Sequence, residues 1–288
     1  MTARPPVASV VLPLRNAASH ADEQLEALAG QQLAGGWELV VVDNGSTDRT
    51  RRHVDAWRIR LPTMRVVQAA DKQGGAYARN VGVTHATAPL LVFCDGDDIV
   101  SPQWLNRLVD ALRRHPMVIG SIDLSLLNDP GRLPREHRAP LAAHRGFLPL
   151  VDTCNFGVRR EVFESIGGFC EEMRRACDAD FGWRAQLAGY QLHFEGDALI
   201  NKRLRHSASG ALVRNFNAAL WDPVLYQRFA GAGMPRLSPS QAIRAWYDLA
   251  TGAPEHLWDH GRRYRYLEWA GFRLGRLAGS VRHRTWFP

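Results

Sequence analysis

The stretch Trp37-Glu-Leu-Val-Val-Val-Asp43-Asn-Gly45 decides the fold that this sequence can form. Its apolar, largely β-branched run is typical of a strand buried on both faces, and the polar residues from Asp43 onward end it. A second such run, Leu90 to Cys94, leads directly into Asp95-Gly-Asp-Asp98. Between these two strands, helices are expected on either side of a further short strand. Strands that alternate with helices predict an α/β fold with a mainly parallel, Rossmann-like sheet flanked by helices.

Other segments extend this alternation in both directions. Further strands are expected over residues 8–14, 64–68 and 117–124, and helices over residues 20–32, 74–84 and 101–114, the last capped by Ser101-Pro102. From Ala211 onward the pattern is helical. We therefore expect a domain over residues 1–210, with a nucleotide-binding half over about 1–100 and an acceptor half over 101–210, and a helical C-terminal extension over 211–288.

The composition is that of a globular protein with a basic C-terminal third. The formal charge is 36 − 29 = +7, and residues 201–288 alone hold 14 Lys/Arg against 5 Asp/Glu. Apolar runs stay far below the ~20 residues that span a bilayer. The segment before Leu14 lacks the layout of an export signal, so we expect a cytoplasmic protein. The cysteines lack metal-site spacing and are expected to be free thiols: Cys94, Cys154, Cys170 and Cys177.

The acidic turn after Cys94 is the first candidate site. Asp95, Asp97 and Asp98 place three carboxylates within four residues at the end of an expected strand, where their mutual repulsion has to be offset. Mn²⁺ or Mg²⁺ would offset it, because these cations prefer oxygen ligands and can bridge to phosphate. The alternative is a solvated acidic turn that caps the helix after Ser101.

Two further motifs have the chemistry of a nucleotide site. Asp43, at the end of its strand, can accept a hydrogen bond from a ring N–H or a ribose hydroxyl, although a capping turn without any ligand explains the same residues. Gly74-Gly75 opens a helix that carries Arg79 and Asn80. A guanidinium at that position can meet a diphosphate or pair with a carboxylate at a strand end.

Together, and in this order, the motifs resemble those of the family 2 glycosyltransferases, which are inverting enzymes with the GT-A fold. The resemblance covers about residues 7–206. It is carried by Pro13–Asn16, Val41–Thr50, Gly74–Gly82, Phe93–Asp98, Asn155–Arg160, Gly167–Phe169 and Asp178–Asp180.

The resemblance implies a nucleotide-sugar donor, with a UDP- or dTDP-sugar as the expected class. Asp43 would contact the base. The other residues expected to face the donor are Asn44, Arg79, Asp95, Gly96, Asp97, Arg203 and Arg205. Asp95 and Asp97 form the DxD motif and would hold Mn²⁺ or Mg²⁺, with His206 as a third metal-ligand candidate. The family's sugar pocket would include the Asn155 region and the loop over residues 128–149.

Asp178 matches the family's catalytic base at the start of a helix, with Asp180 next in line. The function implied is metal-dependent, inverting transfer of a hexosyl or related glycosyl group to an acceptor hydroxyl by a single displacement. Cys177 stands where the family often has Glu, so the acceptor contact that Glu makes is lost. The alternatives are a GT-A-like nucleotidyltransferase, although no Gly-rich loop follows the first strand, and a degenerate nucleotide-sugar-binding protein without turnover.

The extension over 211–288 is rich in Trp and Arg. Leu267, Ala270, Leu274 and Leu277 can share one helical face, with four arginines, Arg276 among them, on another. A basic amphipathic helix suits peripheral contact with the inner face of an anionic membrane and a lipid-linked or cell-wall acceptor. Packing on the catalytic domain or in a homodimer, with the arginines in solvent, is the alternative favoured by Gly271, Gly275 and Gly279. No nucleic-acid-binding motif is found.

Overall fold

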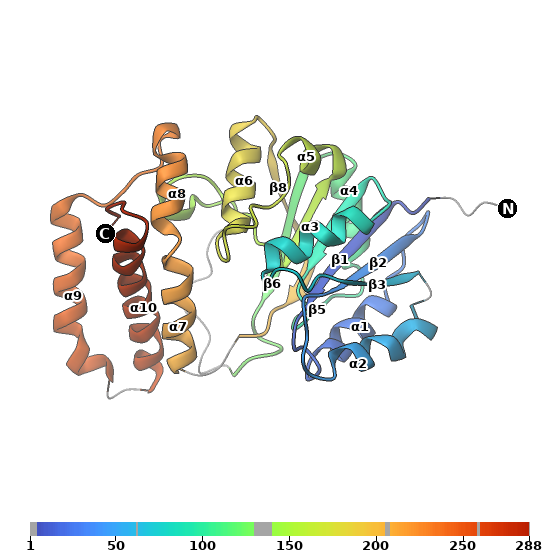
Figure 1. Ribbon diagram of the computed structural model, residues 1–288, viewed down its shortest axis with the longest axis horizontal. Coiled ribbons are helices and arrows are strands. Elements are labelled where there is room, and N and C mark those ends of the chain that lie inside the picture. The colour runs from blue at the N-terminus through green and yellow to red at the C-terminus, as the bar shows by residue number, and fades with distance from the viewer. Residues whose placement is uncertain (1–4, 62, 130–139, 205–207, 258–259, 288) are drawn as a thin grey trace. The chain divides into compact units, whose positions relative to one another are not determined.

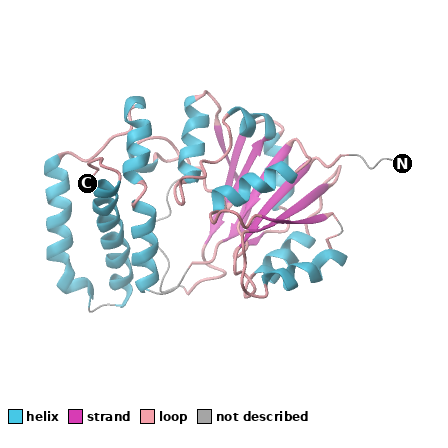
Figure 2. Cartoon of the chain, in the orientation of Figure 1, coloured by secondary structure: helices cyan, strands magenta, loops and turns pink. Residues whose placement is uncertain are grey.

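The structure is a computed structural model that describes residues 5–61, 63–129, 140–204, 208–257 and 260–287, with only the backbone of 208–209, 253–257 and 260–262. The chain divides into two compact units. The first, which we call the sheet unit, comprises Met1–Leu127, Arg138–Ala142 and Pro149–Arg203, and the second, the helical unit, comprises Asn128–His137, Ala143–Leu148 and Leu204–Pro288. Figures 1 and 2 show their helices and strands.

The sheet unit is built on eight strands among its described residues. Their order in the sheet is β3 (Met64–Gln68), β2 (Trp37–Asp43), β1 (Ala8–Leu14), β4 (Leu90–Cys94), β7 (Asn155–Arg159), β6 (Met117–Asp123), β8 (Leu192–Asn201) and β5 (Ile99–Val100). The first four strands of this order are parallel, and β6 and β8 are also parallel. The strand β7 runs antiparallel to β4 and β6, and β5 runs antiparallel to β8. The predicted α/β class is confirmed, with antiparallel pairing confined to β7 and β5.

Helices cover both faces of this sheet (Figure 1). On one face, α1 (Ala21–Ala29), α2 (Thr50–Ala56) and α4 (Trp104–Leu112) contribute Leu25, Val54 and Trp104 to a core that includes alternate residues of β1 and β2. On the other face, α3 (Gly75–His85) lies so close that a Cβ at Gly82 would stand 2.4 Å from Val11 Cγ1. The helices α5 (Arg160–Ser165) and α6 (Cys177–Leu187) complete the sheet unit.

The fourth helix begins later than the sequence predicts. We expected Ser101-Pro102 to start it, but α4 begins at Trp104. The backbone N–H of Ser101 donates to the Leu199 carbonyl at 3.0 Å, so Ser101 still belongs to the edge of the sheet. Its carbonyl accepts a turn hydrogen bond from Trp104 N at 3.1 Å before the helix is established. The expectation of free thiols is confirmed, because all four cysteines are unbridged.

The helical unit contains α7 (Ala208–Ala219), α8 (Asp222–Phe229), α9 (Pro239–Leu257) and α10 (His260–Arg282). Three glycines of α10 bring its backbone against α7. A Cβ at Gly271 or Gly275 would lie 2.3 Å from the carbonyl oxygen of Leu212 or Phe216, and one at Gly279 would lie 2.5 Å from that of Leu220. The glycines therefore mark close packing, as expected, but the partner is α7 of the same unit, whereas the expected partners were the catalytic domain or a second copy. Among the described residues, no helix is both long and apolar enough to cross a lipid bilayer.

The predicted faces of α10 are wrong at one arginine and at two leucines. Arg276, expected in solvent, is 8% exposed, and its Nε donates to Asp222 Oδ2 at 2.8 Å, while Arg145 pairs with the same carboxylate. Its guanidinium also lies 4.3 Å from the ring centroid of Phe272. Leu274 and Leu277, expected to pack, are 42% and 39% exposed. The cause is Asp222, a buried partner about fifty residues away that helical periodicity does not reveal.

Candidate active site

The carboxyl ends of the parallel strands bring the first motifs to one edge of the sheet. Leu14 of β1 lies in register with Asp43 of β2, and Asp43 lies in register with Gln68 of β3. The strand β4 is parallel to β1 and ends at Cys94, directly before the acidic turn. Open α/β sheets bind their ligands beyond such an edge, so this is where a site is expected.

Polar residues of the second motif hold the loop that follows β1. Asn16 Oδ1 accepts from the backbone N–H of Thr47 at 2.8 Å, and the Asn16 N–H donates to Ser46 Oγ at 3.0 Å. Asp48 Oδ2 accepts from the Ala18 N–H at 3.2 Å. Much of the polarity of this motif therefore serves to join two loops.

Asp43 and Asn44 lie together at the end of β2 but differ in what they can offer a ligand. Asp43 is 6% exposed, and its carboxylate accepts from Ser46 N at 2.9 Å and from Gln68 Nε2 at 3.3 Å, which leaves lone pairs on both oxygens. The Asn44 amide donates to two carbonyls of the loop before α3 and accepts from Gly74 N at 2.8 Å. The geometry therefore makes Asn44 a brace for that loop.

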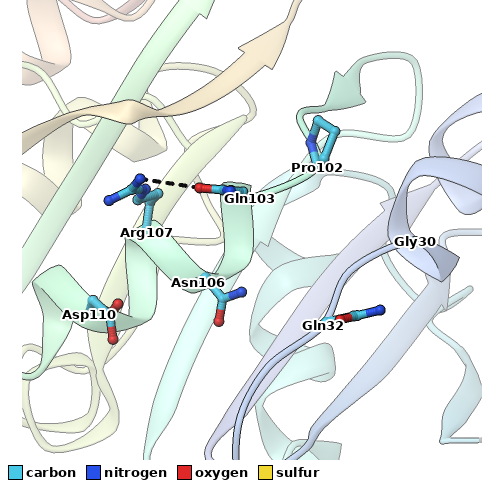
Figure 3. Close-up of a pocket in the computed structure, with 7 residues that line it drawn as sticks. All are labelled: Gly30, Gln32, Pro102, Gln103, Asn106, Arg107 and Asp110. Atoms are coloured by element: carbon cyan, nitrogen blue, oxygen red, sulfur yellow. Dashed lines mark hydrogen bonds between the residues drawn. The ribbon is translucent and has the colours of Figure 1, made fainter.

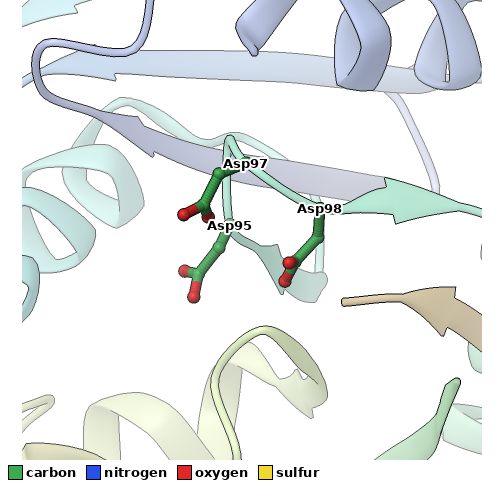
Figure 4. Close-up of side chains that lie close together, drawn as sticks. All are labelled: Asp95, Asp97 and Asp98. Carbon is green, nitrogen blue, oxygen red and sulfur yellow. The ribbon is translucent and has the colours of Figure 1, made fainter. Parts of the chain in front are cut away.

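The acidic turn forms a compact cluster of carboxylates (Figure 4). Asp95, Asp97 and Asp98 offer ligand oxygens that all lie within 4.8 Å of one another. Asp98 is 2% exposed; its Oδ1 accepts from Arg203 N at 2.9 Å, and its buried Oδ2 lacks a hydrogen-bond partner among the described residues. Burial, reinforced by the neighbouring charge of Asp95, raises the pKa of Asp98 to about 7. A buried oxygen without a partner beside two further carboxylates fits a divalent cation.

Buried contacts hold this turn in shape. Gln24 of α1 is fully buried, donates to the Asp95 carbonyl at 3.1 Å and accepts from Val100 N at 3.1 Å, so it joins the two ends of the turn. Gly96 has no room for a side chain, because a Cβ there would lie 2.0 Å from Leu14 Cδ2. Arg203, expected to face the donor, donates from Nε to the Asp97 carbonyl at 3.1 Å and from Nη2 to Glu23 at 2.5 Å.

Arg79 lies beside the cluster on α3. It is 7% exposed, and its Nη2 donates to Asp95 Oδ1 at 2.5 Å, while its buried Nε lacks a partner among the described residues. Burial alone would lower the pKa of Arg79, but the negative charges of Asp95 and Asp178 raise it. Of the two sequence alternatives for Arg79, the structure displays the pairing with a strand-end carboxylate.

Asp178 lies at the start of α6, as the sequence predicts. The side chain is partly exposed, and its Oδ1 accepts from Ala179 N at 2.8 Å. Burial, and then the negative charge of Asp152, raise the pKa of Asp178. Cys177 is buried, and burial raises its thiol pKa to about 12, so the thiol is neutral. Asp180 is fully buried and paired with Arg184 at 2.8 Å, which removes it as a substitute base.

Two charged residues near the site, Asp152 and Lys202, were not among the residues predicted from the sequence. Lys202 Nζ donates to Asp152 Oδ2 at 3.2 Å and to Cys154 Sγ at 3.2 Å. Burial would raise the pKa of Asp152, but the charge of Lys202 lowers it to about 2. The signal available was the basic run Lys202–His206, in which Arg203, Arg205 and His206 drew attention instead. Arg205 and His206 lie outside the described residues.

Two other features do not belong to the cluster. The Asn155 amide, expected near a sugar, is 1% exposed and donates to the Ser121 and Ala198 carbonyls at 2.8 Å each, so it joins strands.

A polar pocket between the end of α1 and the first turns of α4 is shown in Figure 3. It is lined by Gly30, Gln32, Pro102, Gln103, Asn106, Arg107 and Asp110.

Comparison with known proteins adds the family. The family model described as "Glycosyl transferase family 2" matches residues 9–167, more than half of the chain. The chain belongs to this family. The glycosyltransferase is 28% identical over 205 residues to glycosyltransferase AglE of Haloferax volcanii, an alignment that covers 69% of the chain and 67% of AglE. It spans only 26% and 24% of two further curated relatives, which are glucosyltransferases.

Solved structures agree on the fold. The mannosyltransferase PcManGT from Pyrobaculum calidifontis, solved with GDP-Man and Mn²⁺, superimposes with a TM-score of 0.65 at 19% identity, over 97% of this chain and 87% of that one. TarS 1-349 of S. aureus, solved with UDP-GlcNAc, gives a TM-score of 0.56 at 19% identity, over 98% and 93% of the two chains. The glycosyltransferase therefore has the expected GT-A fold.

Proposed function

We propose that this glycosyltransferase moves a hexosyl or related sugar from a UDP- or dTDP-sugar to an acceptor hydroxyl by a single inverting displacement that depends on Mn²⁺ or Mg²⁺. The observation that carries the proposal is the carboxylate cluster of Asp95, Asp97 and Asp98 with the buried, unpartnered Oδ2 of Asp98. Asp178, whose pKa is raised, supports the same chemistry, and so do solved neighbours bound to nucleotide sugars.

The donor's base is assigned to the edge formed by β2 and β3. The Asp43 carboxylate keeps lone pairs after its bonds to Ser46 N and Gln68 Nε2, so it can accept the ring N–H of uracil or thymine. Arg79 and the backbone at Gly96 are assigned to the donor's diphosphate. Asp95 and Asp97 would hold the cation, with Asp98 beside them and His206 as the remaining candidate ligand.

Asp178 is assigned the role of general base. A hydroxyl is a poor nucleophile until a positioned carboxylate takes its proton. The acceptor oxygen forms the new bond to the anomeric carbon, the bond from that carbon to the phosphate oxygen breaks, the diphosphate leaves with the electron pair, and the proton moves to Asp178. When bound, the divalent cation supplies positive charge that offsets the charge of the leaving diphosphate.

A nucleotide panel tests this proposal. We expect UDP or dTDP with Mn²⁺ to raise the melting temperature, because a ligand that binds only the folded state stabilises it. GDP and ADP should do so less, and Asp43→Ala should remove the preference among the bases. Slow hydrolysis of the matching nucleotide sugar would then demonstrate turnover. Binding without hydrolysis or transfer would favour a degenerate binding protein, and no nucleotide binding at all would refute the proposal.

We also propose that the helical unit contacts an anionic membrane surface, which would bring a lipid-linked or cell-wall acceptor to the enzyme. Leu274, Leu277 and Val281 lie three and four residues apart on α10 and are 42%, 39% and 76% exposed. The exposed arginines Arg282 and Arg284 follow the stripe directly. Two copies meeting there would bring like charges together, so an anionic surface suits the stripe better than the expected homodimer.

Vesicle flotation tests this second proposal. The protein should float with phosphatidylglycerol vesicles at low salt, release as salt rises, and bind weakly to phosphatidylcholine vesicles. Val281→Asp should reduce flotation, whereas Ile59→Asp, at a 91% exposed site in the sheet unit, serves as the matched control. If the protein does not bind vesicles and light scattering gives twice the monomer mass, the membrane proposal is wrong and the stripe is a homodimer contact.

A further inference from the structure

The ion pair of Lys202 and Asp152 stands apart from the sequence motifs but belongs to the carboxylate site. Lys202 directly follows β8, where its backbone N–H donates to the Asp123 carbonyl at 2.8 Å and fixes the start of the side chain. Its side chain is 29% exposed, and its ammonium donates to Asp152 Oδ2 and to Cys154 Sγ at 3.2 Å each. The side chain is therefore held at both ends and remains partly exposed.

The charges around this ammonium come from both halves of the candidate site. Burial would lower the pKa of Lys202, but the negative charges of Asp152, Asp95 and Asp98 help to raise it well above its usual value. Asp152 in turn is the charge that helps to raise the pKa of Asp178. Lys202 directly precedes Arg203, whose backbone N–H donates to Asp98 Oδ1 at 2.9 Å, so Lys202 lies beside the acidic turn. The proposed function assigns the donor's diphosphate to the same turn.

The other cations that the structure describes at the turn, Arg79 and Arg203, already have partners. Arg79 donates to Asp95, and the guanidinium of Arg203 donates to the Asp97 carbonyl and to Glu23. One partner of Lys202 is the sulfur of Cys154, a neutral thiol because burial raises its pKa. A thiol sulfur is a weak acceptor, so a phosphate oxygen can replace it at little cost.

We propose that Lys202 binds a phosphate oxygen of the donor's diphosphate, and that Asp152 is the positioning residue that holds the ammonium toward it. The inference deepens the proposed function and rests on it. The ammonium would also stabilise the charge that grows on the leaving diphosphate, because it is already oriented before the bond breaks. Asp152 keeps its ionised form throughout, so the proton of the acceptor goes to Asp178.

The test is a set of binding measurements on the full chain with Lys202→Met. With Mn²⁺ present, the dissociation constant for UDP should rise ~10- to 100-fold, as expected for loss of a charged hydrogen bond. The affinity for uridine, which has no phosphate, should stay unchanged. Without nucleotide, Mn²⁺ should bind equally well or more tightly, because a positive charge near Asp95 and Asp98 is gone. Lys72→Met is the matched control, since Lys72 is the one other lysine in the sequence and is 65% exposed.

A purely structural ion pair predicts a different pattern. If Lys202→Met weakens UDP, uridine and Mn²⁺ together, or leaves UDP affinity unchanged, the inference is overturned. Should Lys202→Met fail to fold, Asp152→Asn replaces it: UDP affinity should fall, and the acid limb of the kcat profile should move to lower pH, because Asp178 loses the charge that raises its pKa. If the acid limb of Asp152→Asn does not move and its affinity for UDP is unchanged, the inference is wrong. If the wild-type chain binds uridine but not UDP with Mn²⁺, the proposed donor is wrong and Lys202 loses its ligand.

Discussion

Asp97→Ala should reduce sugar transfer by ~10³-fold or more, because a bound cation supplies several kcal/mol of charge stabilisation at the leaving group. The fold should be unaffected or slightly more stable. The substitution relieves repulsion among Asp95, Asp97 and Asp98, and the contact from Arg203 Nε uses the Asp97 backbone carbonyl, which remains. Initial rates at saturating donor, melting temperature and Mn²⁺ affinity measured by electron paramagnetic resonance check the three statements.

Asp197→Ala is the matched control for this variant. Asp197 is also an aspartate of the sheet unit, but its side chain is 72% exposed and its nearest cation, Arg107, is 3.9 Å away. It should keep wild-type activity and Mn²⁺ affinity. Full activity of the wild-type enzyme in EDTA, or normal transfer by Asp97→Ala, would eliminate the metal-dependent mechanism.

Asp178→Asn should lower kcat by at least ~10²-fold while the affinity for the nucleoside diphosphate changes little. Asparagine keeps the size of the side chain and an oxygen that accepts from Ala179 N, but it cannot take the acceptor's proton. At neutral pH the variant should melt at the same temperature or higher, since burial disfavours the ionised carboxylate that it replaces. Normal transfer by Asp178→Asn would move the base to Asp152, because Asp180 is buried and paired.

The pH profile gives this prediction a second readout. The base works only when ionised, so kcat should be full above the pKa of Asp178 and fall as pH drops through it. Because that pKa is raised by burial and by Asp152, the acid limb should lie at higher pH than for an ordinary aspartate. The limb should be absent from the residual activity of Asp178→Asn.

The parallel half of the fold was predictable because each strand carries its own signal. The strands β1, β2 and β4 are largely buried apolar runs, and the carboxyl ends of β2 and β4 carry the polar motifs that place Asp43 and Asp95 on one edge. The antiparallel strand β7 was not predictable as such. It pairs with β4 and β6, and the buried amide of Asn155 also donates to carbonyls of β6 and β8, contacts that the residue type alone does not reveal.

The site was predictable where local sequence fixes its geometry. The turn Asp95–Asp98 is contiguous, so its carboxylates cluster whatever the rest of the chain does, and Asp178 follows from the start of its helix. Lys202 and Asp152 are 50 residues apart and meet only through the sheet. The contacts of Arg203 were not predictable for the same reason, because Glu23, which accepts from its guanidinium, lies 180 residues earlier.

The position of Arg203 limits where the chain can be shortened. The sheet unit ends at Arg203, and the helical unit resumes at Leu204. Through its backbone N–H and its guanidinium, that last residue clamps Asp98 and the Asp97 carbonyl. A shortened chain cut at Asn201, where the final long strand ends, would lose this clamp together with Lys202. An expression boundary chosen by secondary structure alone would thus remove parts of the candidate site while leaving every described strand intact.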